Sequence, residues 1–360
     1  MKIQKIGDPK IILSNPDSLH NYFGWPSVAR LQDGRITVVC SGFRLAHVCP
    51  FGKAVIAYSE DEGETYTMPA PVIDTVLDDR DAGIVPFGEK NVIFTSFNNT
   101  VEFQRNYAPD VAYRIAYLDR ISPEQEQAAL GNTFKFSYDC GRTFGPLHHS
   151  PVTSPHGPVE LQDGTLLWVG RSHQDGRQLI EKDEIAAYAI AEDGTATYRG
   201  SVEAIENENG KLLSCEPHAF QLPDGTILCH IRVQGGTGEE EVFTVYQTES
   251  TDGGYTWTKP HALLSRKGGS PAHLYRHSSG VLISSYGYRQ MPYGIRLMFS
   301  RDDGKTWDTE NILYETNTTP DLGYPATVEL NDGSLLTVFY AHPDKSSPAV
   351  ILQQKWRIEE

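Results

Sequence analysis

The sequence predicts an all-β protein, a six-bladed β-propeller built from four-stranded antiparallel blades. Three observations predict this fold. An eight-residue phrase recurs four times, a hairpin pattern recurs six times, and a short third strand follows each hairpin. Recurring units of this size along 360 residues are typical of a repeat architecture, in which each unit packs against its neighbours.

The repeated phrase has the frame Ser-x-Asp-x-Gly-x-Thr-aromatic. Its Asp can accept backbone N–H groups in a tight turn, its Gly can adopt a positive φ, and its aromatic ring can pack between sheets. We therefore expect each Asp to be structural and distant from any pocket. The frame resembles the Asp-box of the sialidase (neuraminidase) superfamily. The four copies begin at Ser59, Ser137, Ser250 and Ser300, and 191–194 is a decayed copy.

Each repeat unit is expected to begin with a hairpin, because two alternating apolar runs flank a turn that often contains Asp-Gly. A third strand follows each hairpin, and four of the six third strands lead into a box. The hairpins span 26–39, 82–97, 157–170, 217–232, 271–286 and 325–340, and the third strands are 54–58, 133–136, 184–190, 242–247, 295–299 and 349–353.

The sixth unit has no residues left for a fourth strand. The apolar run 10–13 has no hairpin of its own, so we expect it to complete the sixth sheet and close the ring. Closure would also remove the open sheet edges that promote aggregation. We expect one domain spanning 1–360, and a five- or seven-bladed ring is the alternative.

One insertion, about 101–132, interrupts the regular spacing. Within it, Ser122 precedes Pro123 and lies three residues before Gln125, which predicts a short capped helix over 122–130. The insertion is expected to be a surface decoration, a rim over the site or an oligomer contact.

The charge balance excludes some classes of partner. The formal net charge is −16 and the pI is about 5.2, whereas broad nucleic-acid binding needs a basic surface. No apolar run approaches transmembrane length, so we expect no membrane partner. Five cysteines without C-x-x-C spacing, and a start without an apolar signal segment, favour reduced thiols in the cytoplasm. A secreted or periplasmic form with its signal removed would look the same.

In a propeller the inner strands converge on one axis, so residues before first strands and after second strands are expected to share a mouth. Arginine is enriched there in a strongly acidic chain, which favours a pocket for an anionic sugar, because guanidinium groups bind carboxylates with two hydrogen bonds. The expected mouth residues are Trp25, Arg80, Asp81, His156, Glu216, His218, His273 and Tyr324 before first strands, and Arg44, Asn98, Arg171, His173, Arg232, Arg289 and His342 after second strands.

Four of these residues resemble the sialidase site in chain order and blade position: Glu216, Arg232, Arg289 and Tyr324. The resemblance implies that Tyr324 is the nucleophile and Glu216 its base. It also implies that Arg232 and Arg289 belong to an arginine triad that binds the substrate carboxylate. A neutral tyrosine hydroxyl avoids the repulsion between an anionic nucleophile and an acidic sugar.

The first two blades depart from the sialidase pattern. Gly24 stands where sialidases have the first triad arginine, and 42–53 contains no acid where they have an acid/base aspartate. Arg44 or Arg80 would have to supply the missing charge. Asp81 and His47 are the alternatives for the acid, since histidine can transfer protons near neutral pH.

We therefore expect an exo-acting glycoside hydrolase that removes a terminal sialic or uronic acid, or another polar sugar. Catalysis is assigned to Tyr324, Glu216, Asp81 and His47. No cofactor and no metal are expected, the partner is a carbohydrate, and an oligomer is compatible with the sequence. The alternatives are a glycan-binding propeller without catalysis, and a polysaccharide lyase that uses His47 or His156. Substrate contacts are assigned to Trp25, Arg44, Arg80, Arg171, Arg232, Arg289, His156 and His218.

Overall fold

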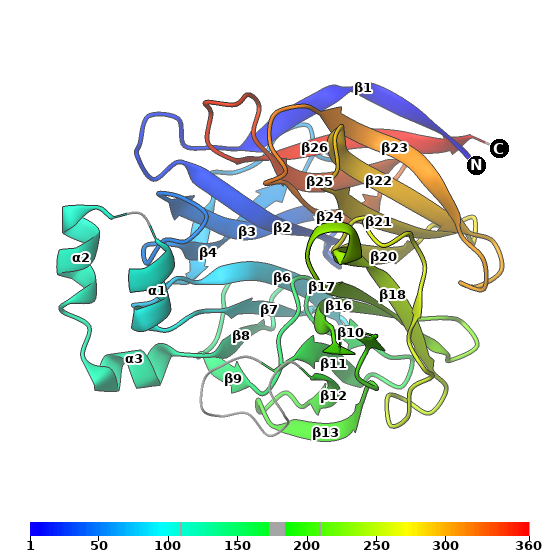
Figure 1. Cartoon of the computed structure of the whole chain (residues 1–360), viewed down its shortest axis with the longest axis horizontal. Coiled ribbons are helices and arrows are strands. Elements are labelled where there is room, and N and C mark those ends of the chain that lie inside the picture. Colours follow the sequence, from blue (N-terminus) through cyan, green and yellow to red (C-terminus); the bar gives the residue numbers. More distant parts are fainter. Residues whose placement is uncertain (109, 173–183, 209, 360) are drawn as a thin grey trace.

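The computed structural model describes residues 1–108, 110–172, 184–208 and 210–359. Their strands form six four-stranded antiparallel sheets arranged as a β-propeller (Figure 1), as the repeats predict. A short hairpin, β14 (Glu206–Asn207) and β15 (Gly210–Lys211), lies between blades three and four and was not predicted.

The first three blades follow the chain without crossovers. In each blade, the first strand named below is the innermost and the last is the outermost. Blade one contains β2 (Tyr22–Arg30), β3 (Ile36–Arg44), β4 (Lys53–Ser59) and β5 (Ala70–Ile73); blade two contains β6 (Arg80–Phe87), β7 (Asn91–Phe97), β8 (Asn132–Ser137) and β9 (His148–Ser150); and blade three contains β10 (Val159–Glu160), β11 (Leu166–Arg171), β12 (Ile185–Ile190) and β13 (Ala196–Ser201).

The last three blades repeat this order, and the N-terminal strand completes blade six. Blade four contains β16 (Leu213–Gln221), β17 (Ile227–Gly235), β18 (Val242–Ser250) and β19 (His261–Ala262); blade five contains β20 (Ala272–Arg276), β21 (Leu282–Tyr288), β22 (Tyr293–Ser300) and β23 (Asp308–Thr316); and blade six contains β24 (Gly323–Glu329), β25 (Leu335–Ala341), β26 (Val350–Glu359) and β1 (Lys2–Leu13).

Closure of the ring by the N-terminal strand is confirmed. β1 pairs antiparallel with β26, from Lys2 opposite Glu359 to Leu13 opposite Ile351. The N- and C-terminal ends accordingly lie side by side in Figure 1. The paired stretch begins eight residues earlier than the predicted run 10–13, because polar residues at the start of β1 also join the ladder.

The four box turns share one hydrogen-bond pattern. In each copy the serine Oγ accepts the glycine N–H at 2.8–2.9 Å, and the threonine Oγ1 donates to the second Asp oxygen at 2.6–2.7 Å. The threonine N–H donates to the first Asp oxygen at 2.8–2.9 Å. The predicted structural role of these aspartates is therefore confirmed.

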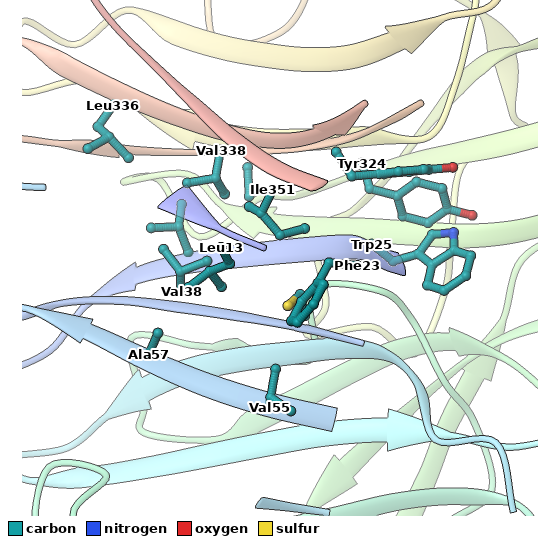
Figure 2. Close-up of a cluster of buried hydrophobic side chains, with 14 of the residues drawn as sticks. Leu13, Phe23, Trp25, Val38, Val55, Ala57, Tyr324, Leu336, Val338 and Ile351 are labelled. Atoms are coloured by element: carbon teal, nitrogen blue, oxygen red, sulfur yellow. The ribbon is translucent and has the colours of Figure 1, made fainter. Parts of the chain in front are cut away.

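The core is a set of apolar layers between adjacent blades. Figure 2 shows the layer between blades six and one, where Leu13, Val38 and Ile351 are almost wholly buried. Trp25 and Tyr324 lie together at one end of this layer. The apolar contacts therefore hold two predicted site residues in place.

The insertion forms three helices that project from one side of the ring in Figure 1: α1 (Val101–Tyr107), α2 (Ala112–Leu118) and α3 (Pro123–Ala129). The predicted capped helix is confirmed as α3, where Ser122 and Gln125 form a capping box. Helices α1 and α2 were not predicted.

All five cysteines lie within the described residues, where they are buried and unbridged. No helix in the described ranges is long and apolar enough to span a membrane.

Candidate active site

The inner strands of blades one, two, four and six each contain a β-bulge. At each bulge one non-glycine residue has a positive φ: 53° at Trp25, 48° at Asp81, 49° at Glu216 and 49° at Tyr324. Side chains rarely adopt this conformation, and bulges of this kind re-aim a side chain next to active sites. The same backbone device therefore presents four predicted site residues.

Tyr324, Glu216 and Arg232 form a direct hydrogen-bonded centre across blades four and six. The Tyr324 hydroxyl donates to Glu216 Oε1 at 2.6 Å, and Arg232 Nη1 donates to Glu216 Oε2 at 2.6 Å. Arg232 Nη1 also donates to the Tyr324 oxygen at 3.2 Å. The long-range prediction that these residues share one site therefore agrees with the geometry.

The protonation states at this centre suit base-assisted attack by a phenol. Burial and the Glu216 carboxylate raise the pKa of Tyr324 well above its usual value. Burial alone would raise the pKa of Glu216, but Arg232 and the Tyr324 hydrogen bond hold it below its usual value. At neutral pH Tyr324 therefore keeps its proton and Glu216 is ionised, so the carboxylate can receive that proton as the phenol oxygen attacks.

Arg232 and Arg289 both lie close to one aromatic ring. Their Cζ atoms are 4.9 Å and 5.3 Å from the centre of Phe243. Gln234 accepts from Nε of Arg232 at 2.9 Å and from its Nη2 at 2.5 Å. Arg289 donates Nε to the Leu322 carbonyl at 3.2 Å, and its terminal nitrogens have no hydrogen-bond partner in the described ranges. Arg289 is thus the arginine that remains available to a ligand.

Asp81 lies next to this centre, at the edge of a small cavity. Burial raises the pKa of Asp81 to about 7, and the nearby Arg80 opposes the rise while Glu216 adds to it. Its Oδ1 is buried and has no hydrogen-bond partner in the described part of the chain. The cavity, about 50 Å³, is lined by Asp81, Phe97, Thr153, Ser154, Pro155, Arg171, Cys215 and Glu216.

Trp25 follows Gly24, the residue that stands in place of the first triad arginine, and its ring lies against two other arginines. The Cζ atoms of Arg80 and Arg44 are 4.2 Å and 4.8 Å from the centre of its ring. Arg44 forms a two-point ion pair with Asp78, and neither side chain is exposed. Arg44 therefore cannot contact a substrate directly, which corrects its predicted role. Arg80 is 7% exposed and donates to the His47 carbonyl at 2.8 Å.

Asp321 is the centre of a second polar cluster, on the side of blades six and one. Its carboxylate accepts from the hydroxyls of Tyr22 at 2.8 Å and Tyr340 at 2.9 Å. It also lies 3.1 Å from Nδ1 of His47 and 3.1 Å from Nε2 of His342. Burial opposes ionisation, but the hydrogen bonds from His342 and His47 hold the pKa of Asp321 well below its usual value.

The three axial histidines lie elsewhere, which corrects the placement of His156 and His218. His156, His218 and His273 line a cavity at the end of the inner strands opposite to Tyr324. His218 and His273 are stacked with ring centres 4.4 Å apart, and burial lowers the pKa of all three. Their cavity, about 330 Å³, is lined mainly by residues that follow the bulges, including 27–30, 84–86, 218–220 and 327–329.

A family model described as a BNR repeat-like domain matches residues 95–337. The chain belongs to this family. No curated protein matches it. Among solved structures, a protein of unknown function from Dyadobacter fermentans is similar over 99% of both chains, with 22% identity and a TM-score of 0.75.

Sialidases are also similar to this BNR repeat protein in fold. The NanB sialidase from Streptococcus pneumoniae is 14% identical with a TM-score of 0.69, over 98% of this chain and 71% of that chain. The intramolecular trans-sialidase from Ruminococcus gnavus is 15% identical with a TM-score of 0.64, over 97% of each chain. At these identities the likeness shows that the chain has the sialidase-superfamily fold.

Sequence reasoning missed several residues of the BNR propeller site. Asp321 lies only three residues before Tyr324, so extending the search a few residues upstream of each inner strand would have found it. Gln234 lies two residues after Arg232 on β17, so the alternation of side chains along a strand would have found it. Phe243 carries no such signal, because its contact with Arg232 depends on how β17 and β18 pair. The predicted mouth residue His173 lies outside the described residues.

Proposed function

We propose that this protein is an exo-acting glycoside hydrolase that removes a terminal acidic or other polar sugar. The observation that carries the proposal is the 2.6 Å hydrogen bond from the Tyr324 hydroxyl to Glu216, a carboxylate that also binds Arg232. A tyrosine that is paired with an ionised carboxylate and a guanidinium is suited to attack an anomeric carbon. The similar fold of proteins named as sialidases supports the same class of reaction.

In this proposal the sugar lies over Tyr324, within reach of two cationic groups. Arg289 offers its unpaired terminal nitrogens to a carboxylate or to hydroxyl groups, and Arg232 stabilises charge on the phenol oxygen as it forms. Gly24 stands in place of the first triad arginine of sialidases and brings no charge, and the adjacent Trp25 side chain is almost wholly buried. This replacement favours a sugar whose acidic group differs in position from that of sialic acid, such as a uronic acid.

The test is a panel of fluorogenic glycosides that contains a sialoside, a glucuronide, a galacturonide and neutral sugars. The parent protein is compared with Tyr324→Phe, which removes only the nucleophilic oxygen. Tyr198→Phe is the matched control, because Tyr198 is exposed on β13, away from the mouth. We expect cleavage of at least one acidic glycoside, and loss of that cleavage only in Tyr324→Phe. Equal turnover by the parent and Tyr324→Phe would refute the assignment of the nucleophile.

A glycan-binding propeller without catalysis is the second candidate. It is favoured by the absence of an acid from 42–53 and by the burial of Arg44. This alternative would be supported if no glycoside of the panel were cleaved and calorimetry showed saturable binding of an acidic sugar.

A further inference from the structure

His47 is held at two separate points although it lies on a loop. Its carbonyl oxygen accepts from Nη2 of Arg44 and from Nη1 of Arg80, each at 2.8 Å. Both arginines also bind the buried Asp78, which accepts from the Cys49 N–H of the same loop at 3.1 Å. This buried network therefore fixes the backbone around His47.

The imidazole ring of His47 is held by Asp321. Nδ1 lies 3.1 Å from Asp321 Oδ1 and 3.2 Å from the Tyr22 hydroxyl, and that hydroxyl donates its proton to Asp321 Oδ2. Because Asp321 is ionised, it favours the tautomer in which Nδ1 of His47 carries the hydrogen. Nε2 is then the atom through which His47 exchanges a proton.

This second ring nitrogen is open to a ligand. The His47 side chain is 50% exposed, and Nε2 has no hydrogen-bond partner among the residues that the structure describes. The ring meets Trp25 edge to face with centres 4.8 Å apart. Tyr340 binds Asp321, and its ring centre lies 6.0 Å from that of Tyr324. The fixed imidazole therefore belongs to the same mouth as the nucleophile.

We propose that His47, positioned by Asp321, gives a proton to the leaving group and then takes one from the attacking water. This inference rests on the proposed function, and it assigns the step that the missing first-blade aspartate leaves open. His47 is the catalytic residue of the pair, and Asp321 is a positioning residue that acts through the ring.

The reaction balances in two displacements. In the first, the Tyr324 oxygen bonds to the anomeric carbon while its proton passes to Glu216, the glycosidic C–O bond breaks, and Nε2–H of protonated His47 gives its proton to the departing oxygen. In the second, water attacks the anomeric carbon, neutral His47 takes a proton from that water, the bond to Tyr324 breaks, and the phenol recovers its proton from Glu216. The net reaction is hydrolysis with retention at the anomeric carbon.

Exposure separates His47 from the other candidate acid. Asp81 is only 5% exposed and lies beside Glu216, below the sugar in the proposed arrangement. The leaving group of an exo-acting hydrolase extends into solvent, and the attacking water enters by the same opening. A half-exposed imidazole at the rim can reach that oxygen, whereas a buried carboxyl on the floor is placed to contact the ring hydroxyls of the sugar.

The first experiment compares two glycosides of the sugar that the panel identifies. One has an acidic phenol as its leaving group, and the other has an alkyl alcohol, which needs protonation to depart. We expect His47→Gln to slow the alkyl glycoside by about 10²- to 10⁴-fold and the aryl glycoside by less than 10-fold. His261→Gln, at an exposed histidine of β19, is the matched control.

Asp81→Asn is measured with the same two substrates, and we expect it to slow both to a similar degree. The proposal is overturned if His47→Gln slows both glycosides equally, or if Asp81→Asn shows the loss that is selective for the alkyl leaving group.

The second experiment tests the pair without requiring turnover. ¹⁵N NMR of the imidazole reports which ring nitrogen carries the hydrogen. We expect neutral His47 to be the Nδ1–H tautomer in the parent protein and to lose this preference in Asp321→Asn, with Asp8→Asn as the control. A parent signal from the Nε2–H tautomer overturns the proposal. If no glycoside is cleaved, the proposed function fails, while this measurement still decides whether Asp321 orients His47.

The pH profile adds a readout that a purely structural role would not change. Burial lowers the pKa of His47, Asp321 opposes this effect, and Arg80 and Arg44 add to it. The Tyr22 hydroxyl also contacts the ring, and His342 acts through Asp321. Since His47 must be protonated to release the alkyl group, that rate should fall as pH rises through the His47 pKa. Asp321 favours the protonated ring, so Asp321→Asn should move this decline to lower pH. An unmoved decline contradicts the positioning role.

Discussion

The box turns and the bulged inner strands each occur four times, but the box turns conserve side chains whereas the bulges conserve a backbone conformation. The boxes keep the same side chains and the same hydrogen bonds, with one distance varying only between 2.6 and 2.7 Å. The bulges keep the same backbone conformation and vary the side chain, which is Trp, Asp, Glu or Tyr. The comparison teaches that the box turns are a constant structural support, whereas the inner strands at the mouth use one backbone geometry to present different side chains.

The largest expected effect lies at a bulge. In Glu216→Gln the amide cannot take the Tyr324 proton, so we expect kcat to fall by about 10²- to 10⁴-fold on the preferred glycoside. Steady-state kinetics would measure the loss, and Glu203→Gln, at an exposed glutamate, is the control. Turnover within about threefold of the parent would show that the bulge positions Glu216 without a catalytic consequence.

Arg289 distinguishes an acidic substrate from a neutral one. Because its terminal nitrogens have no partner in the described part of the chain, Arg289→Ala should remove direct sugar contacts. A hydrogen bond to a charged group contributes about 1.5–3 kcal/mol, so kcat/KM for an acidic glycoside should fall by about 10- to 100-fold. The neutral glycoside of the same ring should change less. Arg276→Ala, at a surface ion pair, provides the comparison, and an equal loss for both sugars would contradict carboxylate binding.

The box turns should affect stability and not turnover. Asp302→Ala deletes the acceptor for Ser300 Oγ and for both the N–H and the hydroxyl of Thr306. We expect the free energy of unfolding to fall by about 1–3 kcal/mol, with kcat unchanged well below the melting temperature. Urea titration measures the change. Glu60→Ala, an exposed position in the first box, should stay within about 0.5 kcal/mol. A change in kcat would mean that the box turns and the active site are coupled.

The smallest expected effect is a change in how steeply the free energy of unfolding varies with pH. Hydrogen bonds from the box threonines lower the pKa of Asp139, Asp252 and Asp302 to about 2, whereas an unfolded Asp titrates near about 3.9. A carboxyl with a lowered folded pKa stabilises the protein above its unfolded pKa, and that contribution is lost as pH falls toward 2. We expect unfolding free energy to decline between pH ~4 and ~2, less steeply in Asp302→Ala. An identical slope in both proteins would contradict the lowered pKa of Asp302.

The sequence predicted the box turns better than the candidate active site, and the reason is physical. The Ser, Asp, Gly and Thr of a box lie within eight residues, so the local sequence is enough to specify the geometry of the turn. The site depends on contacts between blades, such as Tyr324 with Glu216, which lie 108 residues apart. Chain order could suggest this pair through the sialidase resemblance. It could not show that Arg44 is enclosed by Asp78, or that His156 and His218 face the opposite cavity.

The pairing of β1 with β26 also matters during synthesis. β1 is made before every other strand of the propeller, and its partner β26 is made after all of them. A growing chain must therefore carry twelve unpaired strand residues while five blades and most of the sixth emerge. Contacts between such distant segments form slowly, because a long loop must close first. Most residues of β1 are exposed even in the folded ring, and its three lysines disfavour pairing of this segment with another strand edge before β26 is made.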